Sequence, residues 1–196
     1  MNDRSEIADA DEVLIRPSRG RRDPVVAEDL VLGMTGPVLD RLVKHLGACP
    51  VPVAGPVPRR VHQVGEAECP RLTLAGPFLG APQAVLGLEK MIALGVRRVW
   101  VTGWCGSLQP GLCIGDLVLP LGALSDEGTS KHYPLEGPEP ETDPVLRQRL
   151  TAALERRGLS ARAGRIWSTD APYRETRDRV RALRDAGLAA VDIELS

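Results

Sequence analysis

The sequence predicts an α/β fold in which helices cover both faces of a central sheet. Apolar, strand-like runs alternate with helix-like stretches along the chain, and the runs are not polar at every second residue. Strands show this pattern when helices pack on both faces of their sheet. The 196 residues suffice for one domain with a sizeable core.

The first half of the chain begins with a charged segment, residues 1–28, predicted to be a flexible N-terminal arm. It is either a solvated tail or an arm that lies on a neighbouring subunit. The folded domain is expected over residues 29–196. Apolar residues recur at helical spacing in two stretches that start near a proline. We therefore expect helices over 37–46 and 83–94, strands over 29–33, 59–65, 71–75 and 96–101, and a loop over 47–58.

The second half repeats the alternation of strands and helices. Helices are predicted over 144–157 and 175–186, because a glycine directly follows each. Strands are predicted over 116–120, 122–124, 161–167 and 188–193, and residues 125–142 are predicted to form a long polar loop. Sheets of this class bind ligands at the carboxyl ends of their strands. The loops of interest therefore begin at Gly33, Gly76, Thr102, Ser125, Ser168 and Asp192.

Composition excludes several classes of function. The chain has 25 basic and 26 acidic residues and 3% aromatic residues, which argues against a nucleic-acid-binding surface. It has no apolar run of about 18 residues that would span a membrane. Its polar N-terminus does not resemble a secretory signal, so a cytoplasmic protein is expected. The four cysteines and three histidines are scattered, which predicts reduced thiols, no metal site and no cofactor.

Two segments that follow predicted strands are rich in glycine or polar residues. The first is Thr102-Gly103-Trp104-Cys105-Gly106-Ser107, where glycines let a ligand approach the backbone. A plain tight turn is the alternative, and the segment matches neither a P-loop nor a dinucleotide fingerprint. The second is Asp126-Glu127-Gly128-Thr129-Ser130-Lys131-His132-Tyr133, which by composition alone is equally typical of a solvated surface.

Two further segments place acidic groups beyond strand ends. In Ser168-Thr169-Asp170-Ala171-Pro172-Tyr173-Arg174-Glu175 the polar residues could bind a ligand or simply cap the following helix. In Val191-Asp192-Ile193-Glu194 a carboxylate ends an apolar strand. An ionised carboxylate only accepts hydrogen bonds, so it suits the hydroxyl groups of a sugar. A solvent-exposed strand end is the alternative.

Seven ordered segments together resemble the nucleoside phosphorylase family, which includes uridine phosphorylase, hexameric purine nucleoside phosphorylase and the methylthioadenosine nucleosidases. The resemblance extends from Gly33 to Ser196. The segments are Gly80-Ala81-Pro82, Ala93-Leu94-Gly95-Val96, Gly103-Trp104-Cys105-Gly106-Ser107-Leu108, Gly115-Asp116-Leu117-Val118-Leu119-Pro120, Asp126-Glu127-Gly128-Thr129-Ser130, Ser168-Thr169-Asp170-Ala171-Pro172-Tyr173 and Ala190-Val191-Asp192-Ile193-Glu194.

The resemblance implies a three-layer α/β/α fold with a mixed, barrel-like central sheet, assembled as dimers or trimers of dimers. Family members cleave the N-glycosidic bond of a nucleoside with phosphate or water as acceptor. The uridine-type branch is favoured here by the Asp-Glu-Gly-Thr-Ser loop. The carry-over assigns ribose binding to Glu194 and Ile193, and base binding to Cys105, Gly106, Pro172 and Tyr173. Phosphate binding carries over to Gly33, Arg59, Arg60 and Trp104.

The chain also departs from the family pattern at the phosphate site. The arginine two residues before the central glycine is replaced by Val101, and the loop after Gly33 contains no arginine. Trp104 stands where the family has a phosphate-contacting Ser or Thr. The acid that protonates the base in purine-specific members is expected beyond Ser196, so no catalytic residue is assigned and a fragment is expected. The alternatives to a phosphorylase are a nucleosidase that uses water and a non-catalytic nucleoside-binding homologue.

Overall fold

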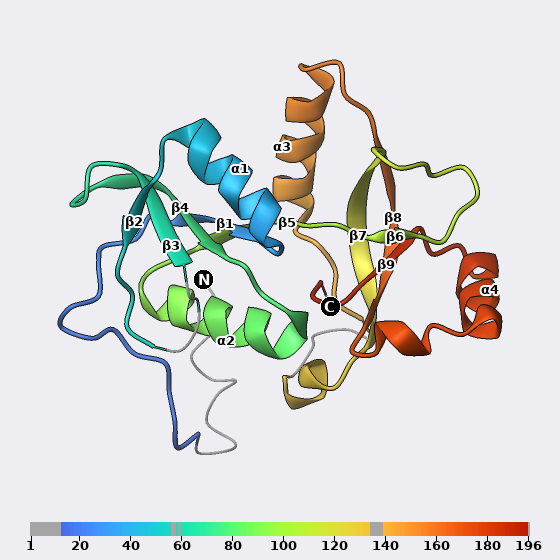
Figure 1. Cartoon of the computed structure of the whole chain (residues 1–196), viewed down its shortest axis with the longest axis horizontal. Helices are drawn as coiled ribbons and strands as arrows, with labels where there is room; N and C mark the ends of the chain where they lie inside the picture. Colours follow the sequence, from blue (N-terminus) through green and yellow to red (C-terminus); the bar gives the residue numbers. More distant parts are fainter. Residues whose placement is uncertain (1–12, 56–57, 59, 134–138, 196) are drawn as a thin grey trace.

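The computed structural model describes residues 13–55, 58, 60–133 and 139–195, and shows a mixed α/β fold (Figure 1). The described helices are α1 (Gly36–Leu46), α2 (Gly80–Ala93), α3 (Pro144–Glu155) and α4 (Arg177–Asp185), with short 3-10 segments η2 (Thr129–His132) and η3 (Pro172–Arg174). The described strands are β1 (Asp29–Gly33), β2 (Cys49–Val51), β3 (Arg60–Gly65), β4 (Pro70–Gly76), β5 (Arg98–Thr102), β6 (Gly106–Ser107), β7 (Leu117–Asp126), β8 (Ala161–Thr169) and β9 (Ala190–Asp192).

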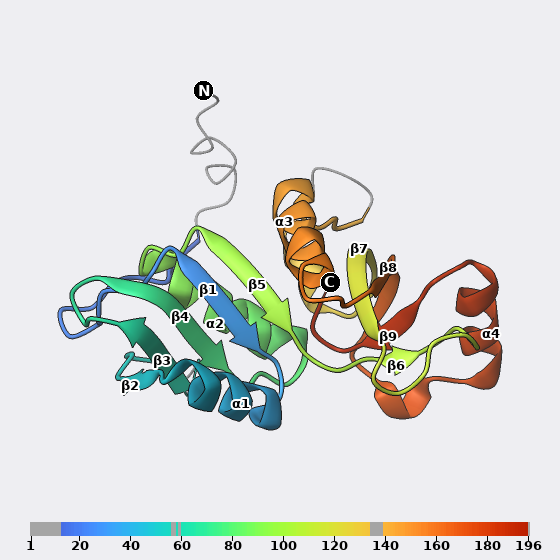
Figure 2. The same cartoon turned by 90° about the horizontal axis from the view of Figure 1, so that it is seen from above.

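The described strands form two mixed sheets. The first has the order β2-β3-β4-β1-β5, and the second has the order β6-β9-β8-β7. β1 runs parallel to both of its neighbours, with Leu30 opposite Thr73 on β4 and Val99 on β5. The carboxyl ends of these three strands therefore lie at one edge. Beyond this edge the chain crosses from β5 to β6 and enters the second sheet (Figure 2).

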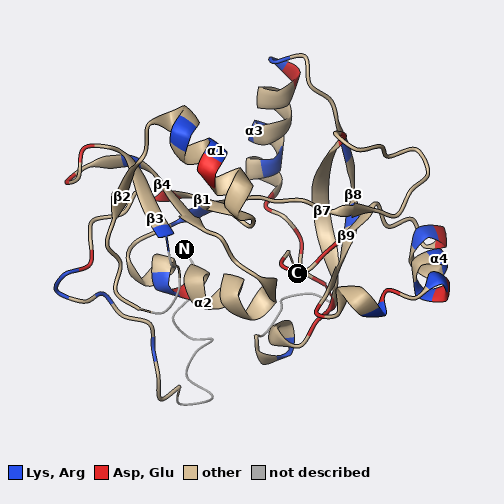
Figure 3. Cartoon of the chain, in the orientation of Figure 1, with Lys and Arg blue, Asp and Glu red and all other residues tan. Residues whose placement is uncertain are grey.

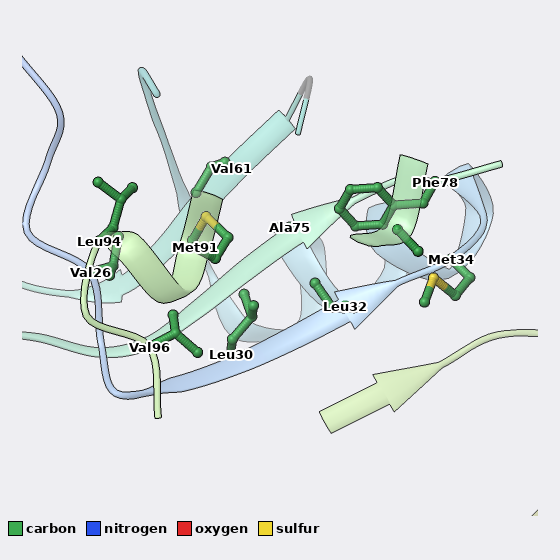
Figure 4. Packing of buried hydrophobic residues seen from close by; sticks show 11 residues of the cluster. Val26, Leu30, Leu32, Met34, Val61, Ala75, Phe78, Met91, Leu94 and Val96 are labelled. Atoms are coloured by element: carbon green, nitrogen blue, oxygen red, sulfur yellow. The ribbon is translucent and has the colours of Figure 1, made fainter. Parts of the chain in front are cut away.

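Helices cover the two faces of the first sheet. Met91 of α2 packs against Leu30, Leu32 and other buried residues on one face (Figure 4). Leu39 of α1 is completely buried, and α1 contacts β1 and β4 on the other face. Burying one such leucine side chain stabilises the fold by about 1.5–3 kcal/mol.

The second sheet has a smaller core. Trp167 of β8 packs with Leu183 of α4 and with Leu188 and Val191 at the end of the chain. α3 lies beside β7 and β8 in both views (Figures 1 and 2), and none of its residues is buried. A further small cluster of Ala123, Ile166 and Ala190 is covered by Val118 and Leu195.

The segment before β1 is tied to the domain over part of its length. Residues 1–12 of the expected arm lie outside the described residues. Asp23 accepts hydrogen bonds from the backbone N–H groups of Gly20 and Ala54 at 2.8 Å each, and from Lys90 Nζ at 2.6 Å. Val26 and Ala27 are buried. The described residues just before β1 therefore contribute to packing.

The α/β prediction is confirmed, and the four predicted helices are present as α1 to α4 with shifted ends. Two details were wrong, and one strand was missed. The predicted loop 47–58 contains β2, which pairs with β3 despite its prolines. The two strands predicted over 116–120 and 122–124 are one strand, β7, whose register with β8 shifts between Pro120 and Ala123. The two-residue strand β6 had no sequence signal, because it exists only through pairing with β9.

Two further observations concern the described chain as a whole. All four cysteines are free thiols. Within the described ranges, no helix has both the length and the apolar character needed to cross a membrane. The predicted polar loop 125–142 contains the end of β7 and η2, while its residues 134–138 lie outside the description.

Candidate active site

Backbone hydrogen bonds join the loops that follow β1, β4 and β5. The N–H of Met34 donates to the carbonyl of Thr102 at 2.9 Å, and the N–H of Phe78 donates to the carbonyl of Met34 at 3.2 Å. These three loops start at the same edge of the first sheet, because their strands are parallel. The sequence thereby brings together segments that are far apart along the chain.

Glycines allow the turn after β5 to approach its neighbours closely. A Cβ at Gly103 would lie 3.1 Å from Cβ of Met34, and one at Gly106 would lie 3.1 Å from Cγ1 of Val191. Gly76 at the end of β4 has a φ of 141°, and a Cβ there would clash with the carbonyl oxygen of Gly33. Larger residues at these positions would push the strand ends apart.

A cavity of about 780 Å³ lies where these loops meet the end of β9. Most of its wall is backbone and apolar surface, with carboxylates from two segments of the chain. The described lining residues are Met34, Thr35, Gly36, Pro77, Phe78, Leu79, Gln83, Trp104, Cys105, Gly106, Glu175, Val191, Asp192, Ile193 and Glu194. Pockets of this size and character are typical of small-molecule sites.

Glu194 lies beside the start of α2 and lines the same cavity as the glycine turn. Its Oε1 accepts a hydrogen bond from the backbone N–H of Gly80 at 3.3 Å. Burial raises the pKa of Glu194 above its usual range, the Gly80 N–H lowers it in part, and the nearby carboxylate of Asp192 raises it again. Glu194 is therefore a half-buried carboxylate with unused capacity to accept hydrogen bonds from a ligand.

Asp192, two residues earlier, is almost completely buried. The hydroxyl of Ser168 on β8 donates to Oδ1 of Asp192 at 2.8 Å. Burial raises the pKa of Asp192, although Ser168 and the backbone N–H groups of Leu195 and Glu194 act to lower it. The other carboxylate oxygen of Asp192, Oδ2, is buried with no hydrogen-bond partner in the described part of the chain.

The glycine turn contributes an indole and a thiol to the cavity. Trp104 lines the cavity and is 66% exposed, so much of the apolar indole faces solvent. Burial raises the pKa of the Cys105 thiol, and the nearby Asp192 raises it further. Cys105 is therefore held as a neutral thiol and not as a reactive thiolate.

The structure brings five of the predicted site residues to this cavity: Trp104, Cys105, Gly106, Ile193 and Glu194. Three others stand apart from its described lining. Tyr173 is 99% exposed on η3, and Pro172 beside it is also exposed. Arg60 makes an ion pair with Asp40 of α1, with Nη2 2.7 Å from Oδ1.

The remaining two predicted residues are Gly33 and Arg59. Gly33 is buried at the end of β1, one residue before the lining begins at Met34. Arg59 lies outside the described residues.

Sequence reasoning missed most of the apolar wall and the polar residues Thr35 and Gln83. Thr35 precedes α1, and its Oγ1 is buried without a hydrogen-bond partner in the described part of the chain. Gln83 Oε1 accepts from the N–H of Leu79 at 3.1 Å, which fixes the start of α2. Thr35 lies two residues after the end of β1, and that strand end is the signal that would have found it, whereas Gln83 lies inside α2.

Fold and site together define an α/β protein with a small-molecule cavity at the carboxyl ends of its strands. Residues 30–196 match the family model of the phosphorylase superfamily. The chain belongs to this superfamily, and the nucleoside phosphorylase resemblance of the sequence is confirmed.

The comparisons also give individual relatives. The guanosine phosphorylase of Halorubrum lacusprofundi is 35% identical over 125 residues, which cover 63% of this chain and 51% of the relative. The DeoD-type purine nucleoside phosphorylase of Bacillus cereus is 27% identical over 126 residues, covering 63% of this chain and 54% of the relative. The matches thus span about half the length of these relatives.

Solved structures share the fold. Uridine phosphorylase from Vibrio fischeri superposes with a TM-score of 0.76 at 20% identity, covering 87% of this chain and 70% of the other. Purine nucleoside phosphorylase from Toxoplasma gondii superposes with a TM-score of 0.77 at 18% identity, covering 90% of this chain and 75% of the other. AMP nucleosidase from Bacteroides thetaiotaomicron superposes with a TM-score of 0.74 at 21% identity, covering 87% of this chain and 72% of the other.

Proposed function

We propose that this chain binds a nucleoside in the cavity and cleaves its N-glycosidic bond. The observation that carries the proposal is the position of Glu194, a half-buried carboxylate facing a cavity at the strand ends of a phosphorylase-superfamily fold. The relatives include enzymes named for guanosine, for purine nucleosides and for uridine. Their shared chemistry supports this reaction for the present chain.

In this proposal the ribose lies against the end of β9. Glu194 accepts hydrogen bonds from ribose hydroxyl groups, and Ile193 packs on the sugar. The charge of the carboxylate makes these hydrogen bonds strong, with each worth about 1.5–3 kcal/mol. The base lies over the glycine turn, where Cys105 and Gly106 line the cavity. Breaking the bond places positive charge on the ribose, which a nearby carboxylate stabilises.

The finer parts of the proposal come from the sequence. A uridine-type preference, a homo-oligomeric state and a cytoplasmic location are proposed on the family resemblance. A non-catalytic nucleoside-binding protein is the second candidate, because the described lining of the cavity contains no arginine or lysine to hold phosphate. Binding without turnover would favour that candidate.

Release of free base tests the proposal. The purified chain is incubated with uridine, inosine, guanosine, adenosine and methylthioadenosine, and base is measured by liquid chromatography. We expect base from at least one nucleoside, and a large loss in Glu194→Gln but not in Glu155→Gln, an exposed residue at the end of α3. If calorimetry detects binding and no base appears, the second candidate replaces the first. If neither is detected, both fail.

A further inference from the structure

Carboxylates dominate the charge of the cavity. Glu175, Asp192 and Glu194 all line it, and its described lining residues include neither lysine nor arginine. In Figure 3 the acidic colour follows the last segment of the chain beyond β9. Asp192 and Glu194 already repel each other, since the charge of Asp192 raises the pKa of Glu194. An additional anion in this cavity would meet the same repulsion.

Four described arginines in and near the first sheet lie outside the lining of this cavity. Arg60 pairs with Asp40. Arg71, Arg98 and Arg149 line a separate cavity of about 690 Å³ that also includes Asp29, and Arg98 Nε lies 2.7 Å from Oδ1 of Asp29. Inorganic phosphate is bound in proteins by bidentate arginines, by lysines or by several convergent N–H groups. The described lining of this cavity contains neither arginine nor lysine.

The turn after β5 adds a steric reason. Trp104 lies in the cavity at the position where the family resemblance places a Ser or Thr that contacts phosphate. An indole has a single N–H donor and no acceptor, and most of its surface is apolar. It therefore replaces a small hydroxyl partner of phosphate by a bulky apolar wall.

We infer that this cavity excludes phosphate and that water accepts the glycosyl group. This inference rests on the proposed function. The oxygen of water forms a bond to C1′ while the bond between C1′ and the base nitrogen breaks, and the bonding electron pair leaves with the base. One cavity carboxylate takes the proton that water loses, and the base takes a proton from solvent. The products are free ribose and free base.

The test compares base release in phosphate-free buffer and in buffer with millimolar phosphate, and identifies the sugar product by NMR. We expect equal rates, free ribose and incorporation of labelled oxygen from water at C1. A rate that rises about tenfold or more with phosphate, a factor worth about 1.4 kcal/mol, overturns the inference, as does ribose 1-phosphate. Loss of that phosphate effect in Arg60→Ala would identify Arg60 as the cation that holds phosphate.

Binding of phosphate gives a second readout that needs no turnover. Titration followed by ³¹P NMR is expected to show no binding to the wild type. Glu175→Arg, which reverses one charge in the cavity, is expected to bind phosphate at least about tenfold more tightly, while Glu155→Arg on α3 does not. Wild-type binding at millimolar phosphate, or no gain in Glu175→Arg, overturns the inference. No base release in either buffer overturns the proposed function, and with it the assignment of water.

Discussion

The carboxylate of Glu127 is predicted to hold the polar loop after β7 in place. The Ser125 hydroxyl donates to Oε1 at 2.6 Å, and the Thr129 N–H donates to Oε2 at 2.5 Å. The Ser130 N–H lies 3.2 Å from both carboxylate oxygens. Burial alone would raise the pKa of Glu127, but these hydrogen bonds outweigh it and lower the pKa from 4.5 to about 2.

The size of this effect follows from the pKa. A fall from 4.5 to about 2 corresponds to about 3 kcal/mol of stability at neutral pH. Glu127 is only 3% exposed, so solvent screens this contribution little. Because the folded pKa is lowered, the stabilisation is complete above pH 4.5 and is lost as the pH falls toward about 2. Roughly half of it remains at about pH 3.

Replacement of Glu127 by Gln tests this account. Gln would place an NH₂ group toward the N–H groups that now donate to Oε2. We therefore expect the free energy of unfolding to fall by about 2–3 kcal/mol at pH 7. Urea unfolding followed by circular dichroism measures it, with Glu155→Gln as the exposed control. The difference in free energy of unfolding between this variant and the wild type should halve near pH 3. A gap below about 0.5 kcal/mol at pH 7, the range of ordinary surface substitutions, refutes the reasoning.

Three further predictions concern the site and the core. Glu194→Gln is expected to weaken ribonucleoside binding about 10- to 100-fold by calorimetry, as loss of charged hydrogen bonds does, and unchanged affinity would contradict the ribose assignment. Gly87→Ala is expected to destabilise the chain by about 1–2 kcal/mol although alanine favours helices, because its Cβ would clash with Phe78 Cε1; a urea midpoint equal to or above the wild type would show that Phe78 moves freely. Burial lowers the pKa of His62, so as the pH falls the unfolded chain binds a proton before the folded chain does, and the free energy of unfolding decreases below pH 6.5. His62→Gln should make this decrease shallower between pH 7.5 and 5.5 in urea unfolding. An unchanged slope would assign the decrease to other groups.

The elements that form through local sequence were predictable. Pro37 and the apolar spacing of residues 38–46 gave α1, and the stretch up to Gly95 gave α2, because both signals reside within one helix. β2 and β6 were not predictable, because three or two residues carry no period and their pairing is set by distant strands. Continuous β7 was read as two strands, because Pro120 and Gly122 are ordinary signals of a break.

The residues of the site likewise include some that the sequence predicted and some that it did not. Glu194 and the turn at 103–106 were found because they follow apolar strands, and the fold joins them through Val191 opposite Gly106. The buried state of Glu127 was not readable from its polar surroundings, since a loop that folds around a carboxylate has the composition of a solvated loop. Phe78 likewise reaches the cavity only through the hydrogen bond that joins its loop to Met34.

The most direct test of the account is a crystal structure of this chain with a C-nucleoside, whose sugar and base are joined by a carbon–carbon bond that the proposed reaction does not break. The account predicts that the ribose hydroxyl groups donate to the Glu194 carboxylate and that the base lies against Cys105 and Gly106. A ligand bound at another place, or one in this cavity with its sugar turned away from Glu194, would contradict the account.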